Sequence, residues 1–150
     1  MSTKKIITSL LFSIFALLAS SLVQAENSQD FGEFVVHFNA LKTDQLPPSV
    51  TKQYGIKRSK NRGMINIAVL TKMLGTTGKP VAAKVSASAK NLTGQRRDIK
   101  LREVREDNAI YYIGEFPVTN EETLRFSVEV TPEGSSDSYT VDFKQQFYTG

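Results

Sequence analysis

A run of basic and hydrogen-bonding side chains is the part of this sequence with the clearest chemical potential. Residues 57–62 read Lys-Arg-Ser-Lys-Asn-Arg, and the run contains no acidic residue. Guanidinium groups bind phosphates and carboxylates through paired hydrogen bonds, and Ser and Asn add neutral partners. The run therefore predicts a loop that binds lipid head-group phosphates, lipopolysaccharide or an acidic protein. The alternative is a solvated loop in which Arg58 or Asn61 ties a helix to a sheet.

Other residues that could do chemistry have simpler structural interpretations. Residues 96–105 contain five basic side chains, but acidic residues are interleaved with them, which indicates cross-strand pairing or a charged sheet edge. His37 is the single histidine, and catalytic or metal sites need several convergent groups. Tyr54, Tyr111 and Tyr112 could line an aromatic groove, although such residues normally pack at the rim of a core with the hydroxyl hydrogen-bonded.

Composition excludes most enzyme classes. The chain has 150 residues, no cysteine and one histidine, so disulfide scaffolds, thiol nucleophiles and zinc ribbons are ruled out. No nucleophile elbow, phosphate loop or metal-binding signature is present. We therefore expect a protein that is not an enzyme and that carries no catalytic residues, no metal ligands and no cofactor.

The first 25 residues have the anatomy of a secretory signal peptide. Lys4 and Lys5 precede an uncharged apolar stretch over residues 6–18, and Val23-Gln24-Ala25 ends in a small residue where a signal peptidase would cut. The alternative is an uncleaved anchor, but the apolar stretch is short for a membrane span. The sequence predicts export to the periplasm, with outright secretion as the alternative, and no transmembrane segment after cleavage.

Removal of the leader weakens any argument for nucleic-acid binding. Without Lys4 and Lys5 the 19 basic residues become 17, against 15 acidic residues, so the net charge falls from +4 to about +2. A charge this small gives little attraction for a polyanionic nucleic acid, and the expected compartment argues against it as well.

The rest of the chain alternates apolar and polar residues with the period of β-strands. The clearest run covers residues 124–130, where Leu124, Phe126 and Val128 alternate with Arg125, Ser127 and Glu129. About seven such runs are separated by turn sequences rich in Gly, Asn, Asp and Pro. This pattern predicts an all-β fold, an immunoglobulin-like antiparallel β-sandwich occupying residues 26–150, with a closed barrel as the alternative.

One segment, at about residues 44–63, breaks the alternation. Pro47 and Pro48 suit the first turn of a helix, and Gly55 suits the position that ends one. The sequence therefore predicts a helix-loop insert of about two turns, followed by the basic run described above. Its candidate binding residues are Tyr54, Lys57, Arg58, Ser59, Asn61 and Arg62.

The order of these parts resembles a known family. Tyr54-Gly55-Ile56, then Arg58-Ser59 and the apolar strand over residues 65–69, are similar to the bacterial proteins grouped as domain of unknown function 4426. The resemblance implies an exported Ig-like β domain and no assigned activity. More loosely, residues 112–116, with the pattern Tyr-x-Gly-x-Phe, resemble a strand of the FixH and YtkA domains, which implies a copper or oxidase context.

Three functional hypotheses remain open from the sequence. The first is a periplasmic binding or accessory module that uses residues 54–62 to contact an envelope protein or an anionic envelope component. The second is a metal carrier, for copper, or an oxidase-assembly accessory protein built on the same scaffold. The third is a structural subunit of an envelope complex, in which the terminal strand pairs across a dimer.

Overall fold

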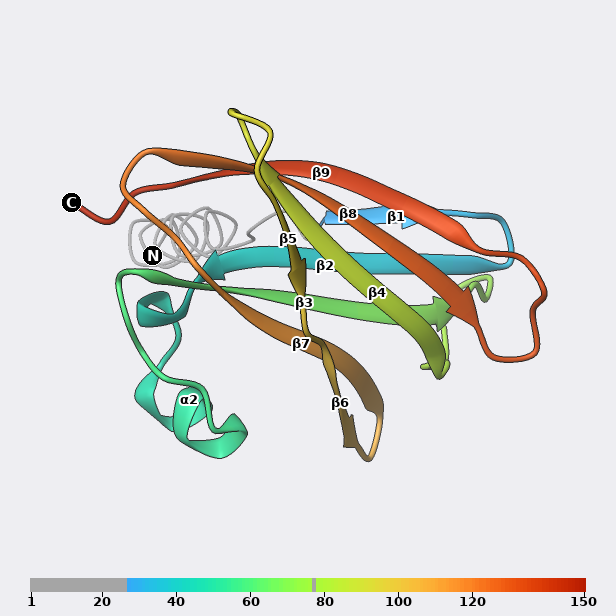
Figure 1. Ribbon diagram of the computed structural model, residues 1–150. Coiled ribbons are helices and arrows are strands. Elements are labelled where there is room, and N and C mark those ends of the chain that lie inside the picture. Colours follow the sequence, from blue (N-terminus) through green and yellow to red (C-terminus); the bar gives the residue numbers. More distant parts are fainter. Residues whose placement is uncertain (1–26, 77) are drawn as a thin grey trace, which may run out of the picture.

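Two antiparallel β-sheets form a sandwich in the computed structural model, which describes residues 27–76 and 78–150 (Figure 1). Sheet A has the strand order β1-β2-β3-β7-β6, and sheet B has the order β5-β4-β8-β9. The prediction of an all-β sandwich with one short helix is confirmed. The predicted signal peptide lies outside the described residues. Neither helix within the described ranges has the length and apolar character that a membrane span requires.

Along the chain, three strands enter sheet A, two enter sheet B, two return to sheet A and the last two enter sheet B. Sheet A contains β1 (Asn27–Asp30), β2 (Phe34–Lys42), β3 (Arg62–Thr71), β6 (Arg102–Glu106) and β7 (Ala109–Pro117). Sheet B contains β4 (Ala83–Asn91), β5 (Arg96–Ile99), β8 (Glu122–Pro132) and β9 (Tyr139–Phe147). Between β2 and β3 lie a short 3-10 helix, η1 (Thr43–Gln45), and the α-helix α2 (Pro48–Tyr54).

The described residues form nine strands where the sequence predicted about seven. Strand β1 was not predicted because all four of its side chains are exposed and show no alternation. The alternating pattern that continues in the sequence from Ile99 to Leu101 does not form one strand, because the chain leaves sheet B after Ile99 and enters sheet A at Arg102. Lys100 therefore lies between the two strands, and Arg102 begins β6.

Gly114 of β7 makes this crossing between the sheets possible. A Cβ atom at Gly114 would lie 2.5 Å from Ile99 Cγ2 and 2.9 Å from the carbonyl oxygen of Lys100. Both distances are far below van der Waals contact, so any larger side chain would push the crossing segment away. The absence of a side chain lets the segment that joins β5 to β6 lie directly against β7.

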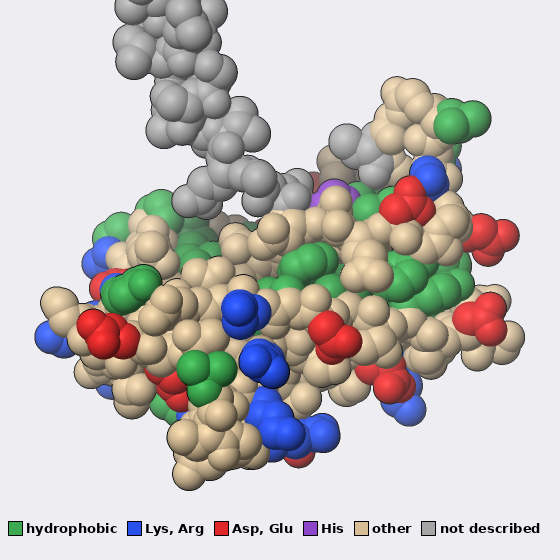
Figure 2. All heavy atoms as spheres, turned by 90° about the horizontal axis from the view of Figure 1, so that it is seen from above, with side chains coloured by type: hydrophobic (Ala, Val, Ile, Leu, Met, Phe, Trp, Pro, Cys, Tyr) green, Lys and Arg blue, Asp and Glu red, His purple; other side chains and the backbone are tan. Residues whose placement is uncertain are grey.

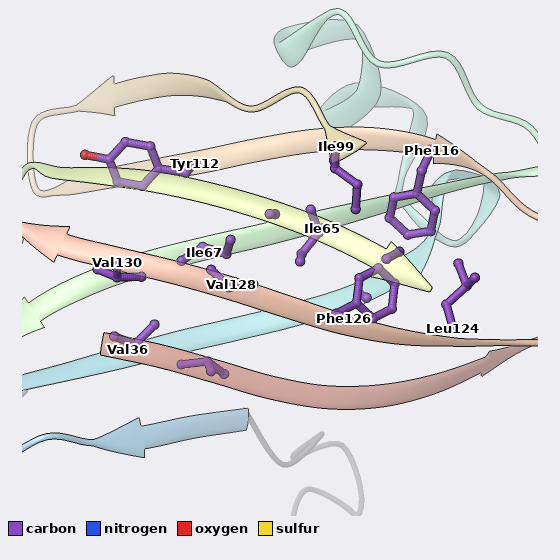
Figure 3. Close-up of a cluster of buried hydrophobic side chains, with 14 of the residues drawn as sticks. Val36, Ile65, Ile67, Ile99, Tyr112, Phe116, Leu124, Phe126, Val128 and Val130 are labelled. Atoms are coloured by element: carbon purple, nitrogen blue, oxygen red, sulfur yellow. The ribbon is translucent and has the colours of Figure 1, made fainter. Parts of the chain in front are cut away.

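The core lies between the sheets and is built from the inward positions of the alternating strands (Figure 3). Phe126 is its aromatic centre, with ring centroids 4.8 Å from Phe143 and 5.2 Å from Phe116. At the other end of the core, Tyr112 of sheet A accepts a 2.7 Å hydrogen bond from the backbone N–H of Ala83 in sheet B. The apolar faces and this bond hold the two sheets together.

Candidate functional site

The helix-loop insert begins and ends as its sequence predicts. Pro48 occupies the first turn of α2, where the missing backbone N–H costs nothing. Gly55 adopts the left-handed conformation, with φ of 63°, and ends the helix. The backbone N–H of Ile56 then donates a 2.8 Å hydrogen bond to the carbonyl oxygen of Thr51, which closes the last turn. The chain therefore leaves the helix in a fixed direction.

The insert covers part of the outer face of sheet A. Ile56 packs with Met64 of β3 and Ile113 of β7 in a second hydrophobic cluster, separate from the core between the sheets. Half-buried side chains complete it, namely Leu41, Leu46, Tyr54, Val104 and Tyr111. Because both faces of sheet A bury apolar side chains here, the insert is packed against the domain and does not project into solvent.

Thr43 is the polar anchor of the insert. Its side chain is fully buried, and its hydroxyl donates a 2.8 Å hydrogen bond to the carbonyl oxygen of Lys57. The same oxygen accepts a 2.9 Å bond from the backbone N–H of Ser59. Burying a hydroxyl costs little when it is hydrogen-bonded, so one side chain fixes the start of the basic run.

The structure places the two arginines of the predicted site in internal contacts. Arg58 donates hydrogen bonds to the carbonyl oxygens of Leu46, at 3.0 Å, and Asp44, at 2.8 Å. Arg62 forms an ion pair with Glu115 of β7, with 3.6 Å between Nη1 and Oε1. Arg58 therefore joins the loop to η1 and the residue after it, where the sequence alternative expected a tie to the sheet.

Tyr54 is also tied to the sheet. Its hydroxyl donates a hydrogen bond to Glu106, and its carbonyl oxygen accepts one from Arg102. The bond to the Glu106 carboxylate raises the pKa of Tyr54, because it stabilises the protonated phenol. These contacts hold the end of α2 against the edge strand β6.

Two further predicted residues contribute to the shape of the loop. Ser59 accepts a 3.2 Å hydrogen bond from the backbone N–H of Asn61, and the carbonyl oxygen of Asn61 accepts a 2.9 Å bond from Val118. Lys57 and Lys60 are exposed, and neither ammonium group forms an ion pair with any residue that the structure describes. Lys57 and Lys60 therefore offer ammonium groups to solvent, and the exposed Arg58, which bonds carbonyl oxygens, also keeps its charge.

A groove of about 750 Å³ lies on the outer face of sheet A beside the insert. Its polar lining includes His37 and Asn39 of β2, Asn66 of β3, Tyr111 of β7 and Gln45 of η1. Apolar and further polar lining comes from Phe38, Ala40, Leu41, Leu46, Ala68 and Gln145. Among the described residues the lining contains no carboxylate, ammonium or guanidinium group.

Strand pairing explains why the polar side chains meet in this groove. Asn39 lies directly opposite Asn66, and His37 lies opposite Ala68, so alternate residues of β2 and β3 face the same space. The side-chain oxygen of Asn66 is buried and has no hydrogen-bond partner among the described residues. His37 and Tyr111 are far apart in the sequence, which does not predict this groove, because only the strand register brings the two residues together.

The described part of the chain holds no recognisable metal centre. Within residues 27–76 and 78–150, no three side chains among His, Asp and Glu lie close enough together to hold a metal ion.

Comparison with solved structures shows the same fold in distant proteins. FetP of uropathogenic Escherichia coli strain F11 has a TM-score of 0.58 at 10% identity, covering 83% of this chain and 94% of FetP. A copper-bound variant of FetP has a TM-score of 0.56 at 10% identity, covering 82% and 95%. At this identity the likeness concerns the fold alone. The comparison with curated proteins gives no match.

A much nearer likeness covers almost the whole described chain. A crystal structure of a DUF4426 family protein from Pseudomonas aeruginosa PAO1 is 36% identical, with a TM-score of 0.71, and the match covers 84% of this chain and 97% of that one. Residues 28–150 also match the family described as "Domain of unknown function (DUF4426)". The resemblance read from the Tyr-Gly-Ile and Arg-Ser elements is thereby confirmed, and the chain belongs to the DUF4426 family.

Proposed function

We propose that this protein is an exported, periplasmic and non-enzymatic binding module, and that the insert with the groove beside it is its contact surface. The leader over residues 1–25 supports export. FetP, which shares the fold, was produced in the periplasm of E. coli. The main observation in support of the proposal is the groove of about 750 Å³. Gln45 and Leu46 of the anchored insert form one side of this groove.

The lining of the groove favours a polypeptide partner. The amide, imidazole and phenol groups donate and accept hydrogen bonds without the strong electrostatic field of a carboxylate, ammonium or guanidinium group. Leu41 and Leu46 offer apolar contact. Such a mixture suits the backbone and neutral side chains of a protein segment. Lys57 and Lys60 on the same insert add attraction for acidic residues, so the partner we propose is an envelope protein with an acidic contact surface.

The same lining supports binding in preference to catalysis. The groove offers one imidazole and one phenol, His37 and Tyr111, and no carboxylate or amine beside them in the described residues. General acid-base or nucleophilic catalysis needs a second and a third convergent group. The proposal therefore assigns no catalytic role to either residue.

Affinity purification of the tagged protein from its own cell envelope tests the proposal. Asn39 is exposed within the groove, so Asn39→Trp should fill it with an indole ring and remove the co-purifying partner. Thr140→Trp is the matched control, because Thr140 is exposed on β9 of sheet B. Recovery of the same partners by the wild-type protein and the Asn39→Trp variant would show that the groove is not the contact surface.

A copper carrier or oxidase-assembly accessory protein is the second candidate, and the observation that favours it is the fold shared with copper-bound FetP. Metal analysis of the purified protein, with His37→Ala as the comparison, separates the two readings. Copper bound in a fixed ratio and lost in His37→Ala would favour the carrier.

A structural subunit is the third candidate, because β9 is an edge strand of sheet B and could pair with a second chain. Light scattering of the purified protein would detect such a dimer.

A further inference from the structure

Four basic side chains form a row across the outer face of sheet B. Lys90 of β4 lies directly opposite Arg96 of β5 on one side and Arg125 of β8 on the other, and Arg125 in turn lies opposite Lys144 of β9. All four residues are exposed, and the strand register places them side by side on the face of sheet B opposite the core positions Ala89, Phe126 and Phe143. We call these four residues the cation row. Figure 2 shows Lys and Arg side chains gathered in this way on the face that it displays.

The cation row is unfavourable for the folded sheet. Like charges directly opposite each other on neighbouring strands destabilise a sheet, whereas opposite charges at the same positions stabilise it. Arg96 has a carboxylate partner, Asp98, at 3.2 Å. Lys90, Arg125 and Lys144 form no ion pair with any residue in the described ranges. A row that works against stability at every cross-strand position indicates a binding role.

A shallow hollow of about 490 Å³ lies along the cation row. The hydroxyl-bearing residues Ser88 and Ser127 line it next to the cations, and Asp142 is the acidic residue in the described lining. Neighbouring strands are about 4.8 Å apart, so four cations in a row extend over about 14 Å. This length exceeds a single phosphate and fits several anionic groups side by side.

Exposed apolar side chains flank the two ends of the cation row. Leu92, in the turn between β4 and β5, is 67% exposed and lies two residues from Lys90. Tyr148, one residue after β9, is 60% exposed and lies four residues from Lys144. Leu and Tyr beside cations are typical of surfaces that sit in the head-group layer of a membrane, where apolar groups enter and cations meet phosphates.

Acidic residues on this face lie beside the cation row and not within it: Asp98 pairs with Arg96, and Asp142 lines the hollow. Asp98, Asp142 and Glu129 occupy positions two or four residues further along their strands, and Glu121 lies in the turn before β8. The four cations lie toward the end of sheet B that bears Leu92 and Tyr148, and Glu121 lies at that same end. The exposed Lys84 lies at the other end of β4.

We propose that the end of sheet B bearing Leu92 and Tyr148 binds an anionic phospholipid surface. The cation row contacts head-group phosphates, and Leu92 and Tyr148 enter the interfacial layer. Juxtaposed cations add their attraction to anionic lipid, so binding depends on the number of charges in the row and weakens as salt is added. The surface lies on the opposite sheet from the groove and the insert, so the two sites can be tested by separate variants.

Co-sedimentation of the exported protein, purified without its leader, with vesicles tests this proposal. The wild-type protein should bind vesicles containing phosphatidylglycerol and should not bind vesicles of phosphatidylcholine alone. The triple variant Lys90→Gln, Arg125→Gln and Lys144→Gln should bind the anionic vesicles about tenfold more weakly or less. The matched control is Lys52→Gln, Lys57→Gln and Lys60→Gln, which removes the same charge from the insert and should change binding by less than about twofold.

Leu92→Ser and a soluble competitor identify the kind of anion. A membrane surface requires that Leu92→Ser weaken vesicle binding, and that inorganic phosphate at matched ionic strength fail to displace the protein. Equal binding by the wild-type protein and the cation-row variant would overturn the proposal, as would equal binding to neutral vesicles. Stronger binding to sulfated dextran, with no effect of Leu92→Ser, would also overturn it, because the row would then recognise a soluble polyanion.

Discussion

The basic run of the insert and the cation row of sheet B use the same side-chain types in different ways. In the insert, Arg58 bonds two backbone carbonyl oxygens and Arg62 pairs with Glu115. In the cation row, Lys90, Arg125 and Lys144 have no carboxylate partner among the described residues and lie opposite one another. The two arginines of the insert thus shape the chain, whereas these three cations from three separate strands of sheet B lie opposite one another.

The largest effect that we expect on the insert comes from its buried anchor. Thr43→Val keeps the shape of the side chain but removes the hydroxyl that bonds Lys57 and Ser59. The free energy of unfolding should fall by about 2 kcal/mol, because buried backbone groups lose their partner. Urea denaturation measures the change, and Thr140→Val on the exposed face of β9 is the control. Unchanged stability would mean that the apolar cluster alone holds the insert.

A smaller loss of stability is expected when the hydrogen-bonded guanidinium of Arg58 is removed. Arg58→Gln should lower the free energy of unfolding by about 1 kcal/mol, because two charge-assisted hydrogen bonds to the carbonyl oxygens of Asp44 and Leu46 are lost. Lys57→Gln, one position earlier, should change it by less than about 0.5 kcal/mol. Urea denaturation measures both changes. Equal losses of stability for the two substitutions would mean that the hydrogen bonds of Arg58 do not stabilise the insert.

The cation row should respond with the opposite sign. Arg125→Thr removes the central like-charge contacts with Lys90 and Lys144 and should raise the free energy of unfolding by about 0.5 kcal/mol. The gain should shrink in about 1 M salt, where the repulsion is screened. Arg97→Thr should instead destabilise the protein, because Arg97 bonds Glu122 at 3.1 Å. Thermal unfolding at low and high salt distinguishes these outcomes.

The smallest expected effect is a shift in the titration of Tyr54. The pKa of Tyr54 is raised in the folded protein by its hydrogen bond to Glu106. The stabilising contribution of this bond is therefore complete below the ordinary pKa of about 10 and is lost as the pH rises through the higher folded value. Absorbance titration of phenolate should show one tyrosine moving to an earlier pH in Glu106→Gln. No movement would mean that the bond does not persist in solution.

The sequence predicted those features that depend on local patterns. Alternation identified β8, because Leu124, Phe126 and Val128 all face the core. Proline chemistry and Gly55 identified the start and end of α2. Arg58 could not be assigned in the same way, because its partners are backbone carbonyl oxygens that leave no side-chain signature.

Features that depend on strand register, or on which sheet a strand joins, could not be predicted from the sequence. Ile99 and Leu101 continue one alternating pattern, yet the chain changes sheets between them. The cation row has no pattern along the chain, since each of its residues is one exposed position in a different strand. The groove lined by His37 and Asn66 likewise exists only because β2 and β3 pair as they do.

The two-residue passage from β5 to β6 has a mechanical consequence. Lys100 and Leu101 leave almost no slack between a strand of one sheet and a strand of the other. A shift of β5 by one residue against β4 would turn Arg97 outward in place of Arg96. Because the connection is so short, β6 would then have to shift against β7 as well. The register of β5 in sheet B therefore depends on the register of β6 in sheet A.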